Sequence, residues 1–298
     1  MSKILVLGAT GMLGSAVMAH ASELGLDVAG TTTQREVADR SPDELIYFDA
    51  ATTPVAEVVG SLAEQDLVIN CVGLIKHLID DASLYSRERA IALNANLPHQ
   101  LDRASRERGF RIIQIATDCV YDGRLGSYVE ESSHNEGDVY GQTKSLGEVP
   151  SPQIMHIRAS IIGRELREHR SLVDWAVLQP KEAVIRGYTD HFWNGVTTTA
   201  FARVALGVVR NGIWRPGLAH LVPADSVSKY ELLGLILRTF GRDDIEVVPT
   251  ETGSPVNRTL ASSDPARNEA LWAAGGYTVL PTIADMVKDL ERVQGEDQ

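Results

Sequence analysis

The stretch Lys3-Ile4-Leu5-Val6-Leu7-Gly8-Ala9-Thr10-Gly11-Met12-Leu13-Gly14 decides the fold of this chain. Its apolar start reads as a buried parallel strand, and an apolar helix is expected to follow. In the spacing Gly-x-x-Gly-x-x-Gly, Gly8 allows a tight turn, Gly11 lets a pyrophosphate approach the helix start, and Gly14 permits close helix-strand packing. The stretch therefore predicts a dinucleotide site that also includes Thr10, Met12 and Leu13, with a tight turn that binds nothing as the alternative.

Strands and helices alternate after this turn. The further ranges that read as strands are 27–31, 45–48, 67–70 and 111–115, and helices are expected at about 83–108, 171–178, 198–211, 226–240 and 281–293. This alternation predicts an α/β fold with a doubly wound parallel sheet, the Rossmann arrangement. We expect an NAD(P)-binding domain over 1–160 and a smaller carboxyl-terminal substrate-binding region, partly interleaved with it, over 161–298.

Polar residues follow the predicted strands at their carboxyl ends, which is where ligands bind in such sheets. These residues include Gly8, Thr31, Asp49, Asn70 and Thr117. Asp49 is placed to accept a hydrogen bond from an adenine amino group, or alternatively to cap a helix near 52–59.

The end of the second strand bears on the choice of cofactor. An acidic residue usually binds the ribose 2'-hydroxyl in NAD sites, but this chain has Thr31-Thr32-Thr33-Gln34-Arg35 there. Hydroxyl groups followed by Arg35 suit a 2'-phosphate better, so NADPH is the expected cofactor and NADH is possible. The alternative is a solvated loop with an ordinary surface arginine.

Tyr140-Gly141-Gln142-Thr143-Lys144 places a tyrosine and a lysine one helical turn apart, on one helix face. A free tyrosine has a pKa of about 10. A neighbouring ammonium and a cationic nicotinamide are expected to favour its phenolate. Tyr140 is thus a candidate acid-base catalyst with Lys144 as its electrostatic partner, and a chance surface pair is the alternative.

Composition limits the classes of function. The chain has 298 residues, 44% of them hydrophobic, and a formal net charge of -12 that opposes binding to nucleic acid or to an anionic membrane. Cys71 and Cys119 have no metal-ligand spacing, so we expect buried free thiols and no metal. The first apolar strand is too short for a signal or membrane segment, and a cytoplasmic location is expected.

Several motifs follow one another in the order of a known family. They are the turn Gly8–Gly14; Ile115–Gly123, which resembles Ser-Thr-Asp-Tyr-Val-Phe-Asp-Gly; Tyr140–Glu148, which resembles Tyr-Gly-x-Thr-Lys-x-x-Gly-Glu; and Ile157–Ser160, which resembles Ile-Arg-Thr-Ser. The chain thus resembles the extended short-chain dehydrogenases/reductases, and most of all the dTDP-4-dehydrorhamnose reductases and related nucleotide-sugar 4-keto reductases.

This resemblance implies an NAD(P)H-dependent reductase of a nucleotide-diphosphate 4-keto-6-deoxy sugar. It implies that Tyr140 donates the proton, that Thr117 binds the substrate carbonyl beside it, and that Lys144 also holds the nicotinamide ribose. Asn70-Cys71-Val72-Gly73 would line the cofactor. Asn94 would order the site, and Arg158 would anchor the junction with the substrate region.

The same resemblance gives candidate substrate contacts. They are Lys76, Thr117, Asp118, Ile161, His191, Trp193 and Arg258, and weaker diphosphate candidates are His77, Arg167, His169 and Arg170. Ile161 stands where the family has a tryptophan that packs on the sugar. We therefore expect a different nucleotide-linked sugar, with His191 or Trp193 filling the space, although a core position is the alternative for Trp193.

Two other functions are compatible with this resemblance. One is a noncatalytic NADP-binding regulatory subunit, as in methionine adenosyltransferase, and the other is a nucleotide-sugar epimerase. The intact Thr117, Tyr140 and Lys144 favour the reductase. A homodimer is possible in each case.

Overall fold

The computed structural model describes residues 2–165 and 169–292, so Arg167 and residues 293–298 lie outside the described part. The chain divides into two compact units, between which it passes several times. The first unit contains Met1–Tyr121, Ser133–Arg158 and Gly212–Ala219, and the second contains Asp122–Ser132, Ala159–Asn211 and His220–Gln298. Among the described residues, no helix combines the length and the apolar character needed to cross a membrane.

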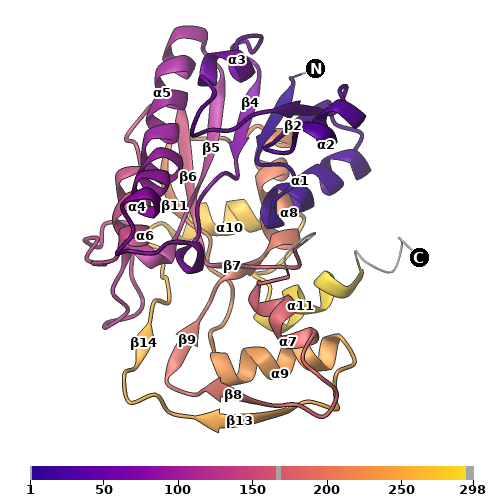
Figure 1. Ribbon diagram of the computed structural model, residues 1–298, viewed down its shortest axis with the longest axis vertical. Helices are drawn as coiled ribbons and strands as arrows, with labels where there is room; N and C mark the ends of the chain where they lie inside the picture. Colours follow the sequence, from indigo (N-terminus) through magenta and orange to yellow (C-terminus); the bar gives the residue numbers. More distant parts are fainter. Residues whose placement is uncertain (1, 166–168, 293–298) are drawn as a thin grey trace. The chain divides into compact units, whose positions relative to one another are not determined.

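A seven-stranded sheet forms the centre of the first unit, in the order β11-β6-β5-β4-β1-β2-β3 (Figure 1). The strands are β1 Ile4–Leu7, β2 Val28–Thr32, β3 Leu45–Tyr47, β4 Leu67–Asn70, β5 Arg111–Ala116, β6 Ile154–Arg158 and β11 Gly217–His220. The pairs among β1 to β6 are parallel, and every residue of β1 and β4 is buried because such strands are covered on both faces. The predicted doubly wound parallel sheet is confirmed.

The helices of the first unit follow the strands in alternation. They are α1 Met12–Glu23, α2 Arg35–Arg40, α3 Val55–Val59, α4 Leu84–Ala90, α5 Leu97–Arg108 and α6 Val139–Leu146. The sequence predicts one helix over 83–108, but a π-helical turn at Ile91–Asn96 separates α4 from α5. Such turns are rare and often lie at functional sites.

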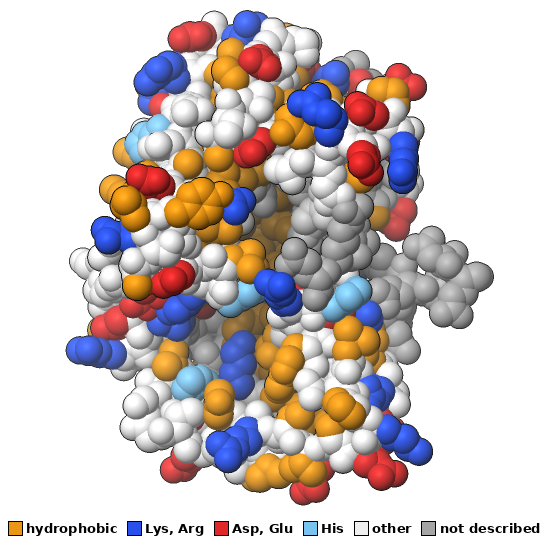
Figure 2. Space-filling view, viewed as in Figure 1, with side chains coloured by type: hydrophobic (Ala, Val, Ile, Leu, Met, Phe, Trp, Pro, Cys, Tyr) orange, Lys and Arg blue, Asp and Glu red, His pale blue; other side chains and the backbone are white. Residues whose placement is uncertain are grey.

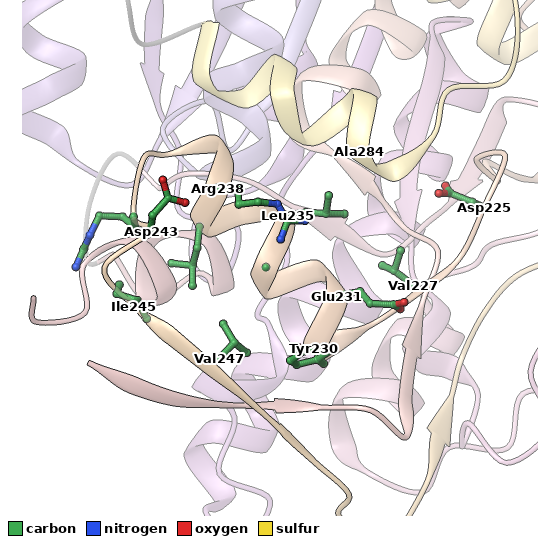
Figure 3. Close-up of a pocket in the computed structure, with 13 residues that line it drawn as sticks. Asp225, Val227, Tyr230, Glu231, Leu235, Arg238, Asp243, Ile245, Val247 and Ala284 are labelled. Atoms are coloured by element: carbon green, nitrogen blue, oxygen red, sulfur yellow. The ribbon is translucent and has the colours of Figure 1, made fainter. Parts of the chain in front are cut away.

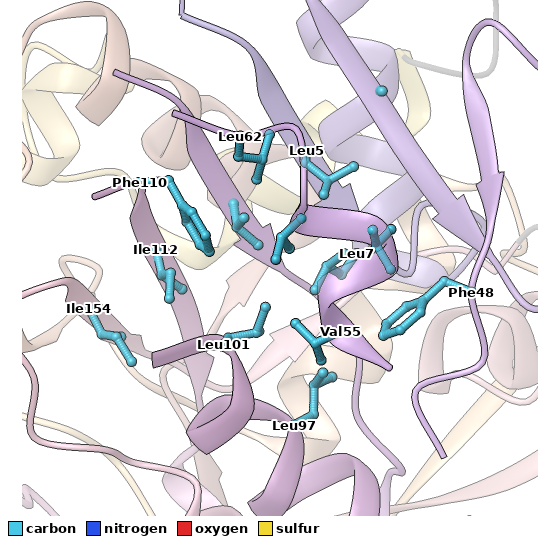
Figure 4. Close-up of a cluster of buried hydrophobic side chains, with 14 of the residues drawn as sticks. Leu5, Leu7, Phe48, Val55, Leu62, Leu97, Leu101, Phe110, Ile112 and Ile154 are labelled. Atoms are coloured by element: carbon cyan, nitrogen blue, oxygen red, sulfur yellow. The ribbon is translucent and has the colours of Figure 1, made fainter. Parts of the chain in front are cut away.

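An apolar cluster of this unit lies between the sheet and the helices α3 and α5 (Figure 4). Leu5 and Leu7 point to this face from β1, because side chains two residues apart in a strand share a face. Val55 from α3 and Leu97 from α5 meet them there. This packing fixes the strand ends from which the site residues extend.

The second unit contains shorter strands and its own helices. The strands are β7 Ile161–Ile162, β8 Val184–Tyr188, β9 His191–Trp193, β10 Val196–Thr197, β12 Val227–Ser228, β13 Glu246–Thr250 and β14 Val256–Asn257. The helices are α7 Leu172–Val177, α8 Thr198–Arg210, α9 Lys229–Thr239, α10 Pro265–Ala274 and α11 Ile283–Arg292. Helix α9 begins later than the predicted residue 226, because Ser228 and Glu231 form a capping box at its start. Helix α10 was not predicted.

A buried ionic network surrounds Arg158 at the end of β6. The Arg158 side chain has no exposed surface, and it donates to the Glu148 carboxylate through Nε at 3.2 Å and Nη2 at 2.5 Å. Its Nη1 donates to the Tyr121 hydroxyl at 2.6 Å. The His134 Nε2 lies 2.8 Å from Nη2 and must accept, since a guanidinium only donates. His134 therefore carries its proton on Nδ1, which lies 2.7 Å from the Ser145 hydroxyl.

This network joins the segments that carry the candidate catalytic groups. Ser145 belongs to α6, Glu148 follows it, and Tyr121 ends the segment that begins at Thr117. Burial lowers the pKa of His134, which favours the neutral ring that the network requires. These contacts anchor Arg158 within the first unit, and the expected role at the junction with the substrate region stays a prediction.

We predict that Glu148→Gln lowers the free energy of unfolding by about 3–5 kcal/mol, because it removes the carboxylate charge that pairs with the buried Arg158 guanidinium. Arg106→Gln is the matched control, since it breaks the Asp102 pair in which Arg106 is 51% exposed and should cost less than about 1 kcal/mol. Urea denaturation of both variants gives the two values. Equal losses in the two would show that the Arg158 network does not stabilise the fold.

Candidate active site

The helix that carries Tyr140 is fixed at its start by a cap. The Asp138 side chain accepts a hydrogen bond from the Gly141 backbone N–H at 2.7 Å, and the Lys76 ammonium lies 2.5 Å from the same carboxylate. A side chain at Gly141 has no room, because its Cβ would lie 2.6 Å from the Cys119 carbonyl oxygen. Lys76, predicted as a substrate contact, is thus paired with the cap of α6.

Thr117 and Asp118 meet Tyr140 beyond the end of β5. The Thr117 hydroxyl accepts from the Cys119 N–H at 3.2 Å, donates to the Asp118 carboxylate at 3.2 Å, and is hydrogen-bonded to the Tyr140 phenol. The Asp118 side chain, predicted as a substrate contact, is only 7% exposed and accepts the Thr117 hydrogen bond. The structure therefore brings the predicted catalytic threonine and tyrosine together.

Lys144 lies one turn after Tyr140 on α6 and is 8% exposed. Its ammonium donates to the Ile115 carbonyl oxygen at 2.9 Å. Burial lowers the pKa of Lys144 to about 8, although the Glu148 carboxylate opposes this change. At neutral pH the group is mostly charged, and it loses that charge at mildly alkaline pH.

Burial also controls the Tyr140 phenol. It raises the pKa of Tyr140 above its ordinary value, and the hydrogen bond with Thr117 acts in the opposite direction with a smaller effect. Burial by itself therefore favours the protonated phenol, and the expected effect of Lys144 together with a cationic nicotinamide stays a prediction. The phenol holds its proton at neutral pH, which is the state needed to donate one.

Asn94 organises this region from the π-helical turn. Its side-chain oxygen accepts from the Leu74 N–H at 2.8 Å, and its amide nitrogen donates to the Leu74 carbonyl at 2.9 Å and to the Thr143 hydroxyl at 3.2 Å. A Cβ at Gly147 would lie 2.0 Å from the Asn94 carbonyl oxygen, so α6 approaches this turn closely. These contacts connect the π-helical turn, the segment after β4 and α6, and the role of Asn94 in ordering a catalytic site stays a prediction.

The glycine turn after β1 fits a dinucleotide. Gly8 has a φ of 77°, and a Cβ at Gly14 would lie 2.1 Å from the Gly8 carbonyl oxygen. Helix α1 begins after Gly11 without a side-chain cap, so its first N–H groups are available to an anion. The Thr31 hydroxyl accepts from the Gly8 N–H at 3.0 Å and fixes the turn.

A pocket of about 250 Å³ opens beside this turn. Of the predicted cofactor residues, it is lined by Gly8, Thr10, Gly11, Thr31, Asp49, Cys71, Val72 and Gly73. Predicted residues that do not line it are Met12, Leu13, Gly14, Arg35 and Asn70, besides Tyr140 and Lys144. Thr32 and Thr33, whose hydroxyl groups the sequence suggested for a 2'-phosphate, also line it, and residues that the sequence did not suggest are Phe48, Ala50, Arg89 and Leu93.

Contacts within the fold explain several of these placements. Asn70 is fully buried and donates to the Gln114 side chain at 2.8 Å, so it belongs to the interior of the sheet. The Arg35 guanidinium lies 4.0 Å from the centre of the Tyr47 ring. The Asp49 carboxylate accepts from the Ala51 N–H at 3.0 Å and does not cap a helix, since α3 begins only at Val55.

The other substrate candidates belong to the second unit. Trp193 is 4% exposed and its indole N–H donates to the Ser160 hydroxyl at 2.9 Å, which places the ring beside the residue preceding Ile161. This burial favours the core position for Trp193. His191 packs against Tyr188 with ring centres 4.9 Å apart, and Arg258 is half-buried.

A larger pocket, of about 550 Å³, lies in the second unit beside α9 and β13 (Figure 3). Its wall includes Arg238, Asp225 and Glu231 but none of the predicted substrate residues. This mixture of charges gives the pocket no preference for an anion. Among the described residues, no group of three or more His, Cys, Asp or Glu side chains could hold a metal ion.

Comparison with curated proteins finds relatives over nearly the whole chain. The dTDP-4-dehydrorhamnose reductase of Mycobacterium tuberculosis is 24% identical over 288 residues, which is 93% of this chain and 88% of that protein. The methionine adenosyltransferase 2 subunit beta of Danio rerio is 24% identical over 258 residues, 83% of this chain and 76% of that protein.

The fold is shared with a solved dTDP-4-dehydrorhamnose reductase from Bacillus anthracis in complex with NADP. That structure is 17% identical, has a TM-score of 0.76 and covers 100% of both chains. Residues 2–267 match the family model described as the RmlD substrate binding domain. Since this match extends from the glycine turn through α6 and into α10, the chain belongs to the RmlD substrate-binding-domain family.

Proposed function

We propose that this chain is an NADPH-dependent reductase of a nucleotide-diphosphate 4-keto-6-deoxy sugar, with Tyr140 as the proton donor. The observation that carries this proposal is the arrangement of Thr117, Tyr140 and Lys144, which α6 and the end of β5 hold in one unit. The names of the M. tuberculosis and B. anthracis relatives, both dTDP-4-dehydrorhamnose reductases, support it.

NADPH, when bound beside the glycine turn, supplies the hydride that reduces the keto carbon. Tyr140 keeps its proton until negative charge develops on the keto oxygen, and then donates it. The Thr117 hydroxyl orients the same oxygen by a hydrogen bond. The charged Lys144 stabilises the phenolate that remains, which matters because burial otherwise disfavours that charge.

A second candidate function is the noncatalytic regulatory subunit that the sequence left open, and the D. rerio relative named methionine adenosyltransferase 2 subunit beta is the reason to keep it. The hydrogen-bonded Thr117 and Tyr140 and the buried Lys144 argue for retained chemistry instead. Measurement of substrate-dependent NADPH oxidation separates the two functions. A homodimer and a cytoplasmic location stay predictions from the sequence.

Replacing Tyr140 tests the proton donor. Tyr140→Phe keeps the ring and removes the acid, so kcat should fall at least about a hundredfold, while the Kd for NADPH changes little. Tyr85→Phe is the control, because Tyr85 is 69% exposed and should leave kcat unchanged. Near-normal turnover by Tyr140→Phe would exclude this mechanism.

The pH profile tests Lys144. Because its pKa is lowered to about 8, the ammonium is present below that value and is lost as pH rises through it. We therefore expect kcat/KM for the keto sugar to decline from about pH 8 upward, well below the ordinary lysine pKa of about 10.4. A profile that stays flat to pH 9.5 would contradict the assignment.

The substrate preference tests Ile161. We predict that the enzyme reduces dTDP-4-dehydrorhamnose poorly and prefers another nucleotide-linked 4-keto sugar, such as one with an N-acetyl group in the space beside Ile161. Ile161→Trp should shift the ratio of specificity constants toward dTDP-4-dehydrorhamnose by about 2- to 12-fold, as expected for one aromatic contact. A panel of keto sugars made in situ by a dehydratase provides the measurement. Highest efficiency with dTDP-4-dehydrorhamnose in the unaltered enzyme would refute this prediction.

A further inference from the structure

One wall of the pocket beside the glycine turn is formed by a helical segment and not by strand ends. Thr31, Asp49 and Cys71 line it from the ends of β2, β3 and β4, as in any sheet of this kind. Arg89 and Leu93 line it from α4 and the π-helical turn. They are four residues apart and so share one face of the helical segment.

Charge distinguishes Arg89 from the rest of this pocket. Among the described residues that line it, Arg89 alone is a cation. Burial raises the pKa of Cys71 to about 12, so this thiol stays neutral, and Asp49 is the one carboxylate. The whole chain has a net charge of -12, so a phosphate needs a local cation of this kind. On the face shown in Figure 2, acidic and basic side chains are interspersed, with no broad basic surface to serve instead.

The Arg89 guanidinium is also available to a ligand. It is exposed and forms no hydrogen bond, ion pair or ring contact with any residue that the structure describes. Arg35, the cation that the sequence suggested, instead lies over the Tyr47 ring and does not line the pocket. Arg89 is therefore the better placed of the two to bind an anionic ligand in this pocket.

Hydrogen bonds of Asn94 hold the helical segment that carries Arg89. Asn94, one residue after Leu93, is held by the Leu74 backbone and the Thr143 hydroxyl. These bonds set the rotation of the helical segment, so Leu93 and Arg89 face the pocket. The same bonds connect this wall to α6, which carries Thr143.

We propose that Arg89 is a phosphate-binding residue of the nicotinamide-dinucleotide site, where it forms a charge-assisted hydrogen bond with a phosphate of the cofactor's adenosine half. This inference rests on the cofactor part of the proposed function and not on its sugar substrate. The phosphate is either the 2'-phosphate, which only NADPH carries, or the pyrophosphate, which NADPH and NADH share.

The test measures the Kd of NADPH and of NADH for Arg89→Gln by fluorescence titration, without a sugar. We expect NADPH binding to weaken about ten- to hundredfold, as for loss of one charge-assisted hydrogen bond. Arg87→Gln is the matched control, because Arg87 lies on the same helix, is exposed and does not line the pocket. It removes the same charge and should change the Kd less than about twofold.

Both supporting outcomes identify the phosphate. If Arg89→Gln weakens the binding of NADPH only, Arg89 contacts the 2'-phosphate. If it weakens the binding of NADPH and NADH equally, Arg89 contacts the pyrophosphate. An unchanged NADPH affinity in Arg89→Gln, or an equal loss in Arg87→Gln, overturns the inference. If the unaltered protein binds NADPH but reduces no keto sugar, the proposed function is wrong. The inference about Arg89 then still holds, because it concerns cofactor binding alone.

Discussion

The hydrogen bonds of the buried Asn94 side chain are the constraint on which the rest of the site depends. One amide satisfies the backbone of Leu74 after β4 and the hydroxyl of Thr143 on α6. A buried amide without such partners would be costly, so the three segments are held in one register. Helix α6, the pocket beside the glycine turn and the loop after β4 therefore share one structural support.

Burial also determines the behaviour of two cationic side chains in the first unit. Lys144 and Arg158 are both withdrawn from solvent in the first unit, and the Glu148 carboxylate interacts with both. The guanidinium forms a close ion pair with this carboxylate, whereas the pKa of Lys144 falls to about 8 because its burial is only partly compensated. One environment thus makes Arg158 a fixed anchor and Lys144 a titratable group near physiological pH.

The sequence predicted the sheet of the first unit because its evidence is local. The apolar run before Gly8 can only be buried on both faces, and Gly14 can only be glycine where the helix meets the turn. The spacing of Tyr140 and Lys144 likewise determines a shared helix face. The roles of these residues in binding and catalysis stay predictions until the variants are measured. Periodicity also missed α10, and it merged α4 and α5 because a π-helical turn has no distinct apolar pattern.

The sequence by itself therefore determined the parallel sheet, the glycine turn and the shared face of the catalytic pair, since each depends on residues close in the chain. Only the tertiary structure decided that burial raises the pKa of Tyr140, that Trp193 is held in the interior of its unit, and that Arg89 and not Arg35 lines the pocket. Each of these facts depends on segments distant in sequence. Solvent exposure and electrostatic surroundings are properties of the packed chain, and no local pattern encodes them.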